Sequence, residues 1–486
     1  MIRPTIKLLN DDTIRRILDE AYQLLEDPGV RVHSDRALEL LDGAGAKIDR
    51  QSRVARIPPD VTRRALETVP RSFHLYNTAG EPAVHYGGDD VHFDPGSAAI
   101  EILDHGSTHS RQPVTADLIA ATRLGEVLLT IDAISTCLVC ADVPEAIGDL
   151  YRLFLVLLNA RKPVVTGAFA VETWSVMHEM LVAVRGSADA LREKPLAVFD
   201  VCPSPPLLWS AITCENLIDC AVNGVPAELV SMPLTGATGP VTLAGAVVQH
   251  AAESLSGIVI HQLAGPGAPI VWGGSPAAFD MRTGTTPMGA VETMMIDMAY
   301  TEVGKSLGLP THAYMGMSDA KVIDAQCGFE SGIGTLLAAL AGVNMVSGAG
   351  MLDFESCFSL EKLVIDAELI GMARRLLTGV VPRGETLALD VLRAVGHRGN
   401  FLEHPSTRQW LREEMTMPSP VVDRDFRREW EGKGTLSAAD RAHQQVEALL
   451  SRWQPVDLPD EVARELERIT LAAARQAGMD TLPART

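Results

Sequence analysis

The feature that most constrains this chain is a regular alternation of two kinds of segment through its middle. Short apolar runs rich in β-branched residues alternate with amphipathic runs of roughly 10–20 residues. This alternation is typical of parallel βα units, in which each strand is followed by a helix that packs on the sheet. The predicted strands are 98–103, 134–141, 163–168, 195–201, 227–232, 269–272, 311–315 and 344–347.

Eight βα units predict an α/β fold, a closed (β/α)8 TIM barrel that has no edge strands. Fewer units would favour an open doubly wound sheet. The first predicted strand is not followed by Gly-x-Gly-x-x-Gly, which counts against a dinucleotide-binding sheet. We therefore expect three parts: an N-terminal helical extension with short strands (1–90), the barrel (91–380) and a C-terminal helical extension (381–486).

The composition excludes several classes of protein. The formal net charge is −20, from 42 Lys and Arg against 62 Asp and Glu, which argues against a nucleic-acid partner. We find no signal peptide and no uncharged apolar run long enough to span a membrane. The seven cysteines lie mostly in apolar segments, as expected of reduced thiols in the cytoplasm. The extensions at both ends of the barrel also favour a homo-oligomer.

In a (β/α)8 barrel the functional residues lie at the carboxyl ends of the strands and in the loops that follow. The seventh predicted strand and the segment after it carry the densest polar cluster at any strand end. Its members are His312, Tyr314, Asp319, Lys321, Gln326 and Glu330. A simpler interpretation is a well-capped amphipathic helix whose charges are solvated or paired.

Two other strand ends carry candidate residues. The glycine-rich loop after the eighth strand contains Glu355, and the alternative interpretation is a flexible loop with solvated carboxylates. The sixth strand ends at Trp272, followed by Arg282. This tryptophan could present its ring to a cation, or it could be a packing residue.

Several catalytic motifs do not occur in the sequence. There is no His-Glu-x-x-His, no Cys/His spacing for zinc, no Walker motif and no Gly-x-Ser-x-Gly. In a strand, Cys137 and Cys140 would point to opposite faces, so this Cys-x-x-Cys predicts no metal or redox site. The residues alone thus predict a barrel enzyme with a small polar pocket and no directly bound metal.

Four segments carry a resemblance to a known family. They are 232–242 (MPLTGATGPVT), 318–330 (SDAKVIDAQCGFE), 340–352 (LAGVNMVSGAGML) and 359–368 (SLEKLVIDAE). Together they resemble the trimethylamine methyltransferase superfamily over nearly the whole chain. The resemblance implies a (β/α)8 barrel that transfers a methyl group from an amine to the cobalt of a cobalamin-type corrinoid, carried by a separate small corrinoid-binding protein.

The founding members of this superfamily use pyrrolysine, which this sequence does not contain. The chain therefore resembles the non-pyrrolysine branch, whose members act on quaternary amines such as glycine betaine. A quaternary ammonium is cationic at every pH and leaves as a neutral amine, so the enzyme needs no general acid. It has to hold the methyl group in line with cobalt and exclude water.

The positions at strand ends suggest a role for each candidate. Phe93, Trp272 and Tyr314 would surround the ammonium group, and Asp319, Glu330 or Glu355 would offer it a negative charge. Lys321, Arg282 or His312 would bind a substrate carboxylate, with Gln326 among the substrate-binding residues. We expect Glu330, Asp319 and Lys321 to be the catalytic group. Two alternatives are a barrel lyase or hydrolase that works without a corrinoid, and a non-catalytic betaine-binding protein.

Overall fold

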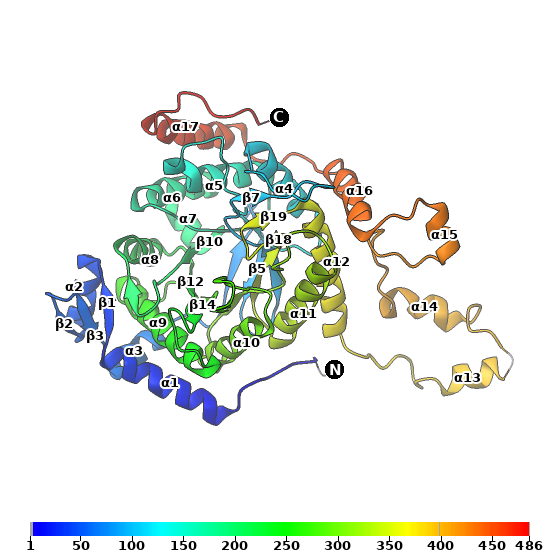
Figure 1. The fold of residues 1–486 in the computed structure, drawn as a ribbon, viewed down its shortest axis with the longest axis horizontal. Coiled ribbons are helices and arrows are strands. Elements are labelled where there is room, and N and C mark those ends of the chain that lie inside the picture. The colour runs from blue at the N-terminus through cyan, green and yellow to red at the C-terminus, as the bar shows by residue number, and fades with distance from the viewer. Residues whose placement is uncertain (1–2, 398, 486) are drawn as a thin grey trace.

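Eight parallel strands lie at the centre of the molecule, and a ring of helices surrounds them (Figure 1). The computed structural model describes residues 3–397 and 399–485. The central strands are β6 (His92–Pro95), β8 (Ile134–Ser135), β9 (Val164–Thr166), β10 (Ala197–Val201), β12 (Ala227–Ser231), β14 (Ile270–Gly274), β16 (His312–Tyr314) and β17 (Met345–Ala349). The helices that follow them are α4 (Thr115–Val127), α5 (Gly148–Asn159), α6 (Val171–Arg185), α8 (Ala211–Asn223), α9 (Leu243–Ala264), α10 (Val291–Ser306), α11 (Ala325–Ala341) and α12 (Leu360–Leu377).

The central strands form two parallel sheets. One has the order β14-β12-β10-β9-β8 and the other β16-β17-β6. A single parallel bridge between Trp272 and Thr311 joins β14 to β16, and the Asp132 amide donates a 2.8 Å hydrogen bond to the Phe93 carbonyl between β8 and β6. The two sheets are therefore neighbours at both of their edges, β14 beside β16 and β8 beside β6. Continuous strand pairing does not extend from one sheet to the other at either edge.

The prediction for the first strand was wrong. The strand beside β17 is β6, whereas the predicted segment 98–103 contains only β7 (Glu101–Ile102), which pairs with β19 (Cys357–Phe358). Strand β6 reads His-Phe-Asp-Pro and lacks the aliphatic run by which the other strands were recognised. Its Asp94 carboxyl makes a polar contact instead, accepting a hydrogen bond from Ser347 between the strands. The other seven predicted strands each overlap an observed central strand.

The N-terminal segment covers one side and one end of the strands. Its elements are α1 (Asp11–Glu26), β1 (Val30–Val32), α2 (Asp35–Ala44), β2 (Lys47–Asp49), β3 (Val54–Arg56) and α3 (Pro59–Thr68). Helices α1 and α3 pack on α9, and β1 pairs with the short β11 (Leu208–Trp209). Helix α9 is long and apolar enough to cross a membrane, but most of its residues are buried inside this fold.

A hairpin of β4 (Phe73–Tyr76) and β5 (Pro82–Tyr86) closes the space between the strands. Its buried Leu75, Val84 and Tyr86 form one apolar cluster with side chains from the central strands and from the residue before β8, namely Ala133, Val165, Val198, Val271 and Met345. The remaining short elements lie in loops: η1 (Glu145–Ile147), α7 (Ala188–Glu193), β13 (Leu234–Thr235), β15 (Ala277–Ala278) and β18 (Met351–Leu352).

The C-terminal segment begins as an arm that projects from the ring of helices (Figure 1). The arm contains α13 (Leu389–Val395), α14 (Pro405–Glu414) and α15 (Arg427–Gly432), and none of these helices has a buried residue. The chain then returns to the body. Helix α16 (Ala438–Leu450) packs on α12 and α4, and α17 (Asp460–Gln476) packs on α6 and α5.

Candidate active site

A cavity of about 510 Å³ lies at the carboxyl ends of the central strands. Each of the eight strands, or the loop that follows it, contributes at least one lining residue. One residue from each in chain order gives Ser97, Thr136, Gly167, Asp200, Met232, Ser275, Tyr314 and Glu355. Such a position, reached from many strand ends, is where barrel enzymes build their active sites.

Tyr314 and Asp200 form the polar centre of the cavity. The Tyr314 hydroxyl donates to Asp200 Oδ2 at 3.0 Å and lies 2.9 Å from Ser97 Oγ. Burial raises the pKa of Asp200 to about 6, so this carboxyl is largely ionised at neutral pH. Asp200 therefore offers the cavity a negative charge.

Glu355 is held in the cavity by a strained loop. Asp353, Phe354 and Glu355 have φ of 50°, 57° and 71°, a left-handed conformation that non-glycine residues rarely adopt. Such strain persists only where the surroundings enforce it, and it gathers at functional sites. Here the Ser97 amide donates to Glu355 Oε1 at 3.2 Å, and burial raises the pKa of this carboxyl to about 8.

A second polar layer lies between the strands below the cavity. His312 Nδ1 lies 3.2 Å from Glu228 Oε1, and His312 Nε2 lies 3.0 Å from Ser347 Oγ, which donates to Asp94. Burial lowers the pKa of His312 to about 3 and raises the pKa of Glu228 well above its ordinary value. The imidazole is therefore neutral and the Glu228 carboxyl protonated, which allows a donor-to-acceptor chain from Glu228 through His312 to Asp94.

Arg152 brings a positive charge to the same cavity from helix α5. The residue is buried, its Nη1 donates to the Thr136 carbonyl at 2.7 Å, and its guanidinium lies 4.7 Å from the centre of the Phe169 ring. Among the described residues, its Nε has no hydrogen-bond partner, and neither has Oδ1 of the lining residue Asn216. The cavity thus combines two acidic groups with one guanidinium, a set that suits a small ligand carrying both charges.

Of the residues predicted from the sequence, the structure brings Tyr314 and Glu355 into the cavity. His312 lies directly beneath, with its ring edge-on to the Tyr314 ring at 4.8 Å. A neutral, fully buried imidazole does not fit the predicted contact with a substrate carboxylate.

The predicted catalytic group forms a separate network outside the cavity lining. Glu330 Oε2 accepts from Ser318 Oγ (2.7 Å) and from the Asp319 amide (2.9 Å), and Glu330 Oε1 accepts from Gln326 Nε2 (2.9 Å). Asp319 Oδ1 accepts from the Met288 amide, and burial raises the Asp319 pKa to about 6. This network orders the start of α11.

Lys321 supports the cavity indirectly. Its ammonium pairs with Asp353 at 3.1 Å and lies 3.8 Å from the centre of the Phe354 ring. It therefore braces the strained loop that carries Glu355.

Three further predicted residues do not line the cavity. Trp272 is fully buried and its Nε1 donates to the Tyr300 carbonyl of α10. Phe93 is buried with the Arg374 guanidinium over its ring, and Arg282 is an 89% exposed side chain paired with Asp280. Successive residues in a strand point to opposite faces, and Trp272 and Phe93 lie on the face toward the helices.

The sequence-based reasoning missed Asp200 and Arg152. Each is the only charged residue within an apolar segment: Asp200 in AVFDV of β10, and Arg152 in YRLFLVLL of α5. A lone charge inside a buried run was the available signal, because a buried charge is costly without a partner or a function.

Comparison with known proteins places the chain in a family. A family model described as trimethylamine methyltransferase matches residues 2–479. The chain is 30% identical to trimethylamine methyltransferase MttB of Desulfitobacterium hafniense, over 87% of this chain and 85% of that protein. It is 28% identical to a glycine betaine methyltransferase of the same species, over 85% of this chain and 86% of that protein.

The similarity to a solved structure is evidence for the fold and not for the function. The monomethylamine methyltransferase of Methanosarcina barkeri superposes with a TM-score of 0.50 at 12% identity, over 92% of this chain and 89% of that chain. The family model and the relatives, by contrast, show which family the chain belongs to. They confirm the prediction that it is a methyltransferase. This chain belongs to the trimethylamine methyltransferase family.

Proposed function

We propose that this chain transfers a methyl group from a quaternary amine of the betaine class to Co(I) of a separate corrinoid protein. We also propose that its eight central strands act as a (β/α)8 barrel, with 1–90 and 381–486 as extensions of a 91–380 core. The observation that carries the functional proposal is a cavity with carboxyl groups and a guanidinium at strand ends, in a member of a methyltransferase family.

The ammonium end of such a substrate would lie near Asp200 and Glu355. A quaternary ammonium has no N–H, so it is recognised by negative charge and by aromatic surfaces rather than by hydrogen bonds. Asp200 lines the cavity and would face it, and the hydrogen bond from Tyr314 fixes the orientation of this carboxylate. A cation beside Glu355 would lower the raised pKa of this residue and favour its ionised form.

The carboxylate end would lie near Arg152. The guanidinium is held by the Thr136 carbonyl and by the Phe169 ring, so it is already oriented before a ligand binds. A preorganised guanidinium binds a carboxylate with little loss of side-chain entropy. Trimethylamine carries no carboxylate and would leave this group without a partner.

The mouth of the cavity suits the docking of a corrinoid protein. Exposed apolar side chains lie on loops that follow four different strands: Ile100, Phe169, Val241 and Met281. When the corrinoid protein docks there, its Co(I) supplies the nucleophile that accepts the methyl group. The residues of this chain bind the substrate, orient one methyl group toward the mouth and exclude water.

The test is anaerobic incubation of the enzyme with cob(I)alamin and a panel of amines. Glycine betaine, proline betaine and carnitine would be compared with trimethylamine by following the change in absorbance as cobalt is methylated. We expect at least one carboxylate-bearing quaternary amine to react and trimethylamine to be inert.

Three other outcomes would refute the proposal. One is no reaction with any quaternary amine at enzyme concentrations near that of cobalamin. Another is tight betaine binding without transfer even with the corrinoid protein, which would identify a binding protein. The third is substrate turnover without any corrinoid, which would identify a lyase or hydrolase.

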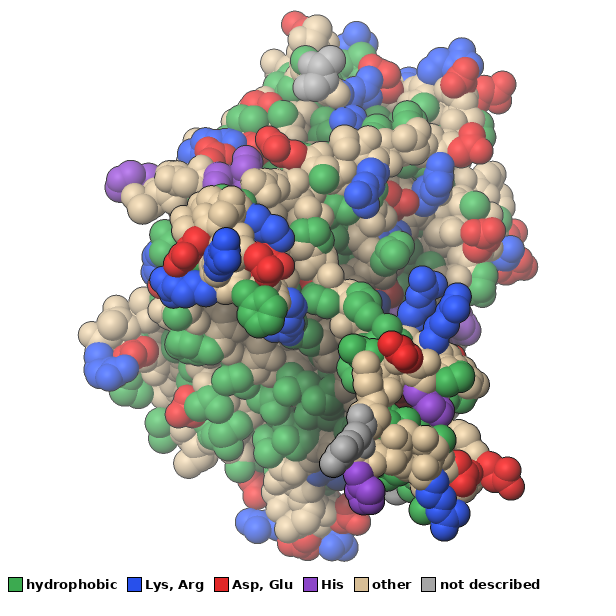
Figure 2. Space-filling model, turned by 90° about the vertical axis from the view of Figure 1, so that its right-hand side faces the viewer, with side chains coloured by type: hydrophobic (Ala, Val, Ile, Leu, Met, Phe, Trp, Pro, Cys, Tyr) green, Lys and Arg blue, Asp and Glu red, His purple; other side chains and the backbone are tan. Residues whose placement is uncertain are grey.

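We also propose that the chain acts as a homo-oligomer in the cytoplasm. The arm exposes Leu387, Leu389, Leu392 and Leu402, and the outer side of α11 exposes Phe329 and Ile333. Figure 2 shows hydrophobic side chains gathered in a hollowed area on the face that carries the arm. The arm begins directly after α12, which packs on α11, so two copies could exchange arms over these surfaces symmetrically. The seven cysteines form no disulfide, as expected in a reducing compartment.

A further inference from the structure

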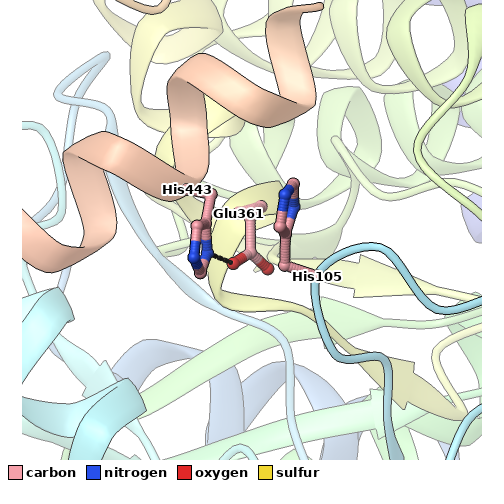
Figure 3. A group of neighbouring side chains, drawn as sticks. All are labelled: His105, Glu361 and His443. Carbon is pink, nitrogen blue, oxygen red and sulfur yellow. Dashed lines mark hydrogen bonds and ion pairs between the residues drawn. The ribbon is translucent and has the colours of Figure 1, made fainter.

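Two histidines and a glutamate from distant parts of the chain converge outside the cavity (Figure 3). His105 lies in the loop after β7, Glu361 in the first turn of α12 and His443 on α16. One ligand atom of each lies within 4.8 Å of the others. His443 Nδ1 is 2.8 Å from Glu361 Oε1, and the two imidazole rings stack at 4.1 Å.

The charges around this cluster are unbalanced. Glu361 is only 4% exposed, and apart from His443 its carboxylate accepts only from Ser359 Oγ, at 3.0 Å. Asp440 lies 3.6 Å from His105 Nε2, and Glu447 lies 3.8 Å from His443 Nε2. Within the described chain none of these three carboxylates forms an ion pair with Lys or Arg. A buried carboxylate without a permanent cation is costly, so this site favours an added positive charge.

We propose that His105, Glu361 and His443 bind a divalent transition-metal ion of the Zn²⁺ type. Two imidazoles and one carboxylate are a common three-residue ligand set for zinc, with water in the fourth position. A separate cavity of about 250 Å³, lined by His105, Glu361 and Asp440, gives that water its place. Magnesium and calcium prefer oxygen ligands, so they fit this set poorly.

Metal binding requires a small change in side-chain orientation. The lone pairs of an imidazole lie in the plane of its ring, and the planes of His105 and His443 are within 8° of parallel. Both rings cannot face one ion in that arrangement. His105 is on a loop and partly exposed, and none of its side-chain atoms forms a hydrogen bond in the described structure, so its ring is the one that turns.

The ion would join the C-terminal segment to the body. His443 lies on α16, which packs on α12 and α4, whereas His105 and Glu361 belong to the loop after β7 and to α12. None of the three lines the larger cavity, so metal binding here is separate from the proposed reaction. No sequence motif predicts this site, because its ligands do not lie at the short spacings of known zinc motifs.

The test is a titration of metal-free, full-length enzyme with Zn²⁺ by calorimetry, repeated with Co²⁺ to record its visible spectrum. We expect one equivalent to bind to the wild-type chain. His105→Ala and Glu361→Gln should each weaken binding by at least roughly 10–100-fold. His109→Ala, on the same loop but outside the cluster, should bind like the wild type and is the matched control.

His443→Ala also removes a bond to buried Glu361, so the melting temperature without metal would be measured for every variant. His105→Ala breaks no described side-chain hydrogen bond and tests the site even if His443→Ala unfolds. Zn²⁺ should raise the melting temperature of the wild type and of His109→Ala only. Equal Zn²⁺ binding by the wild type and the His105→Ala/Glu361→Gln double variant, or no binding by the wild type, would overturn the proposal.

Discussion

Asp200 and Arg152 carry opposite charges and line the same cavity. Arg152 is buried and Asp200 is half-buried, and Arg152 Nε has no hydrogen-bond partner among the described residues. A fold selected for stability alone would have replaced such groups with apolar side chains. A ligand whose own charges pair with these two groups would explain their presence. Substitution of each residue in turn tests this explanation.

The first prediction concerns Asp200→Asn. The amide keeps the shape of the side chain and its bond from Tyr314 but loses the negative charge. We expect kcat/KM for methyl transfer from a betaine to fall roughly 10–100-fold, because bonds to charged groups contribute about 1.5–3 kcal/mol. Steady-state kinetics measures this. The control is Asp297→Asn, which alters another buried acid that does not line the cavity and should leave kcat/KM unchanged.

The second prediction concerns the pH dependence of stability at Glu355. Burial raises its pKa from 4.5 to about 8, so between these values the unfolded chain ionises and the folded chain does not. The unfolded state then binds fewer protons, and stability falls as pH rises through this window. Glu355→Gln should remove that loss and be more stable than the wild type at pH 8 by about 1–3 kcal/mol, with the gain shrinking toward pH 5. Urea unfolding at both pH values measures it, and an unchanged difference between them would contradict the prediction.

At the scale of elements, close packing of helix on strand decides where large side chains point. Trp272 of β14 faces α10, where Gly304 leaves room for the indole. A Cβ on Gly304 would lie 2.5 Å from Trp272 Cδ1, so the helix could not keep its present distance. This contact explains why Trp272 stabilises the ring of helices instead of lining the cavity.

The third prediction follows from this contact. Gly304→Ala should destabilise the fold by about 1–3 kcal/mol, because overpacking displaces either the helix or the indole. Gly328→Ala is the matched control, since a Cβ there meets nothing within 4 Å and α11 would gain helix propensity, stabilising it by up to about 1 kcal/mol. Denaturant titrations followed by tryptophan fluorescence compare the two. Equal stability of both variants would argue against a tight α10–β14 contact.

At the scale of the whole molecule, the arm is difficult to explain in an isolated chain. Helices α13, α14 and α15 have no buried residue, yet they carry several large apolar side chains. Short helices are marginal in water and take most of their stability from packing. A second copy would provide that packing.

The fourth prediction is therefore that Leu389→Asp/Leu392→Asp reduces the mass of the particle in solution. Light scattering coupled to size-exclusion chromatography should show an oligomer for the wild type and a smaller species for the variant. Leu129→Asp introduces a charge at another exposed leucine, far from the arm in sequence, and should leave the mass unchanged. A wild-type monomer at micromolar concentration would contradict the prediction.

The sequence predicted elements better than it predicted the direction of side chains. Runs such as Ile270–Gly274 are apolar because both faces of a parallel strand are buried, and this pattern located seven of the central strands. The same uniform burial hides which residues point inward, so Trp272 and Tyr314 looked equivalent. His92–Pro95 was missed because its interior contacts are polar.

The sequence predicted residues of the cavity only where they lie at the carboxyl ends of strands or in the loops that follow. Those positions include Tyr314 and Glu355, but Arg152 reaches the cavity from a helix. The contacts of Lys321 with the strained loop also depend on tertiary folding, and so does the meeting of His105 with His443. No local pattern records contacts of this kind.

The strained loop has a consequence for laboratory evolution of this enzyme. Glycine at 353, 354 or 355 would relieve the left-handed backbone, so a screen for heat resistance should collect glycines there. The same changes at 353 and 354 would remove the partners of Lys321, and a glycine at 355 would delete the carboxyl itself. Variants selected for heat resistance should therefore lose methyl-transfer activity mainly through substitutions in this loop.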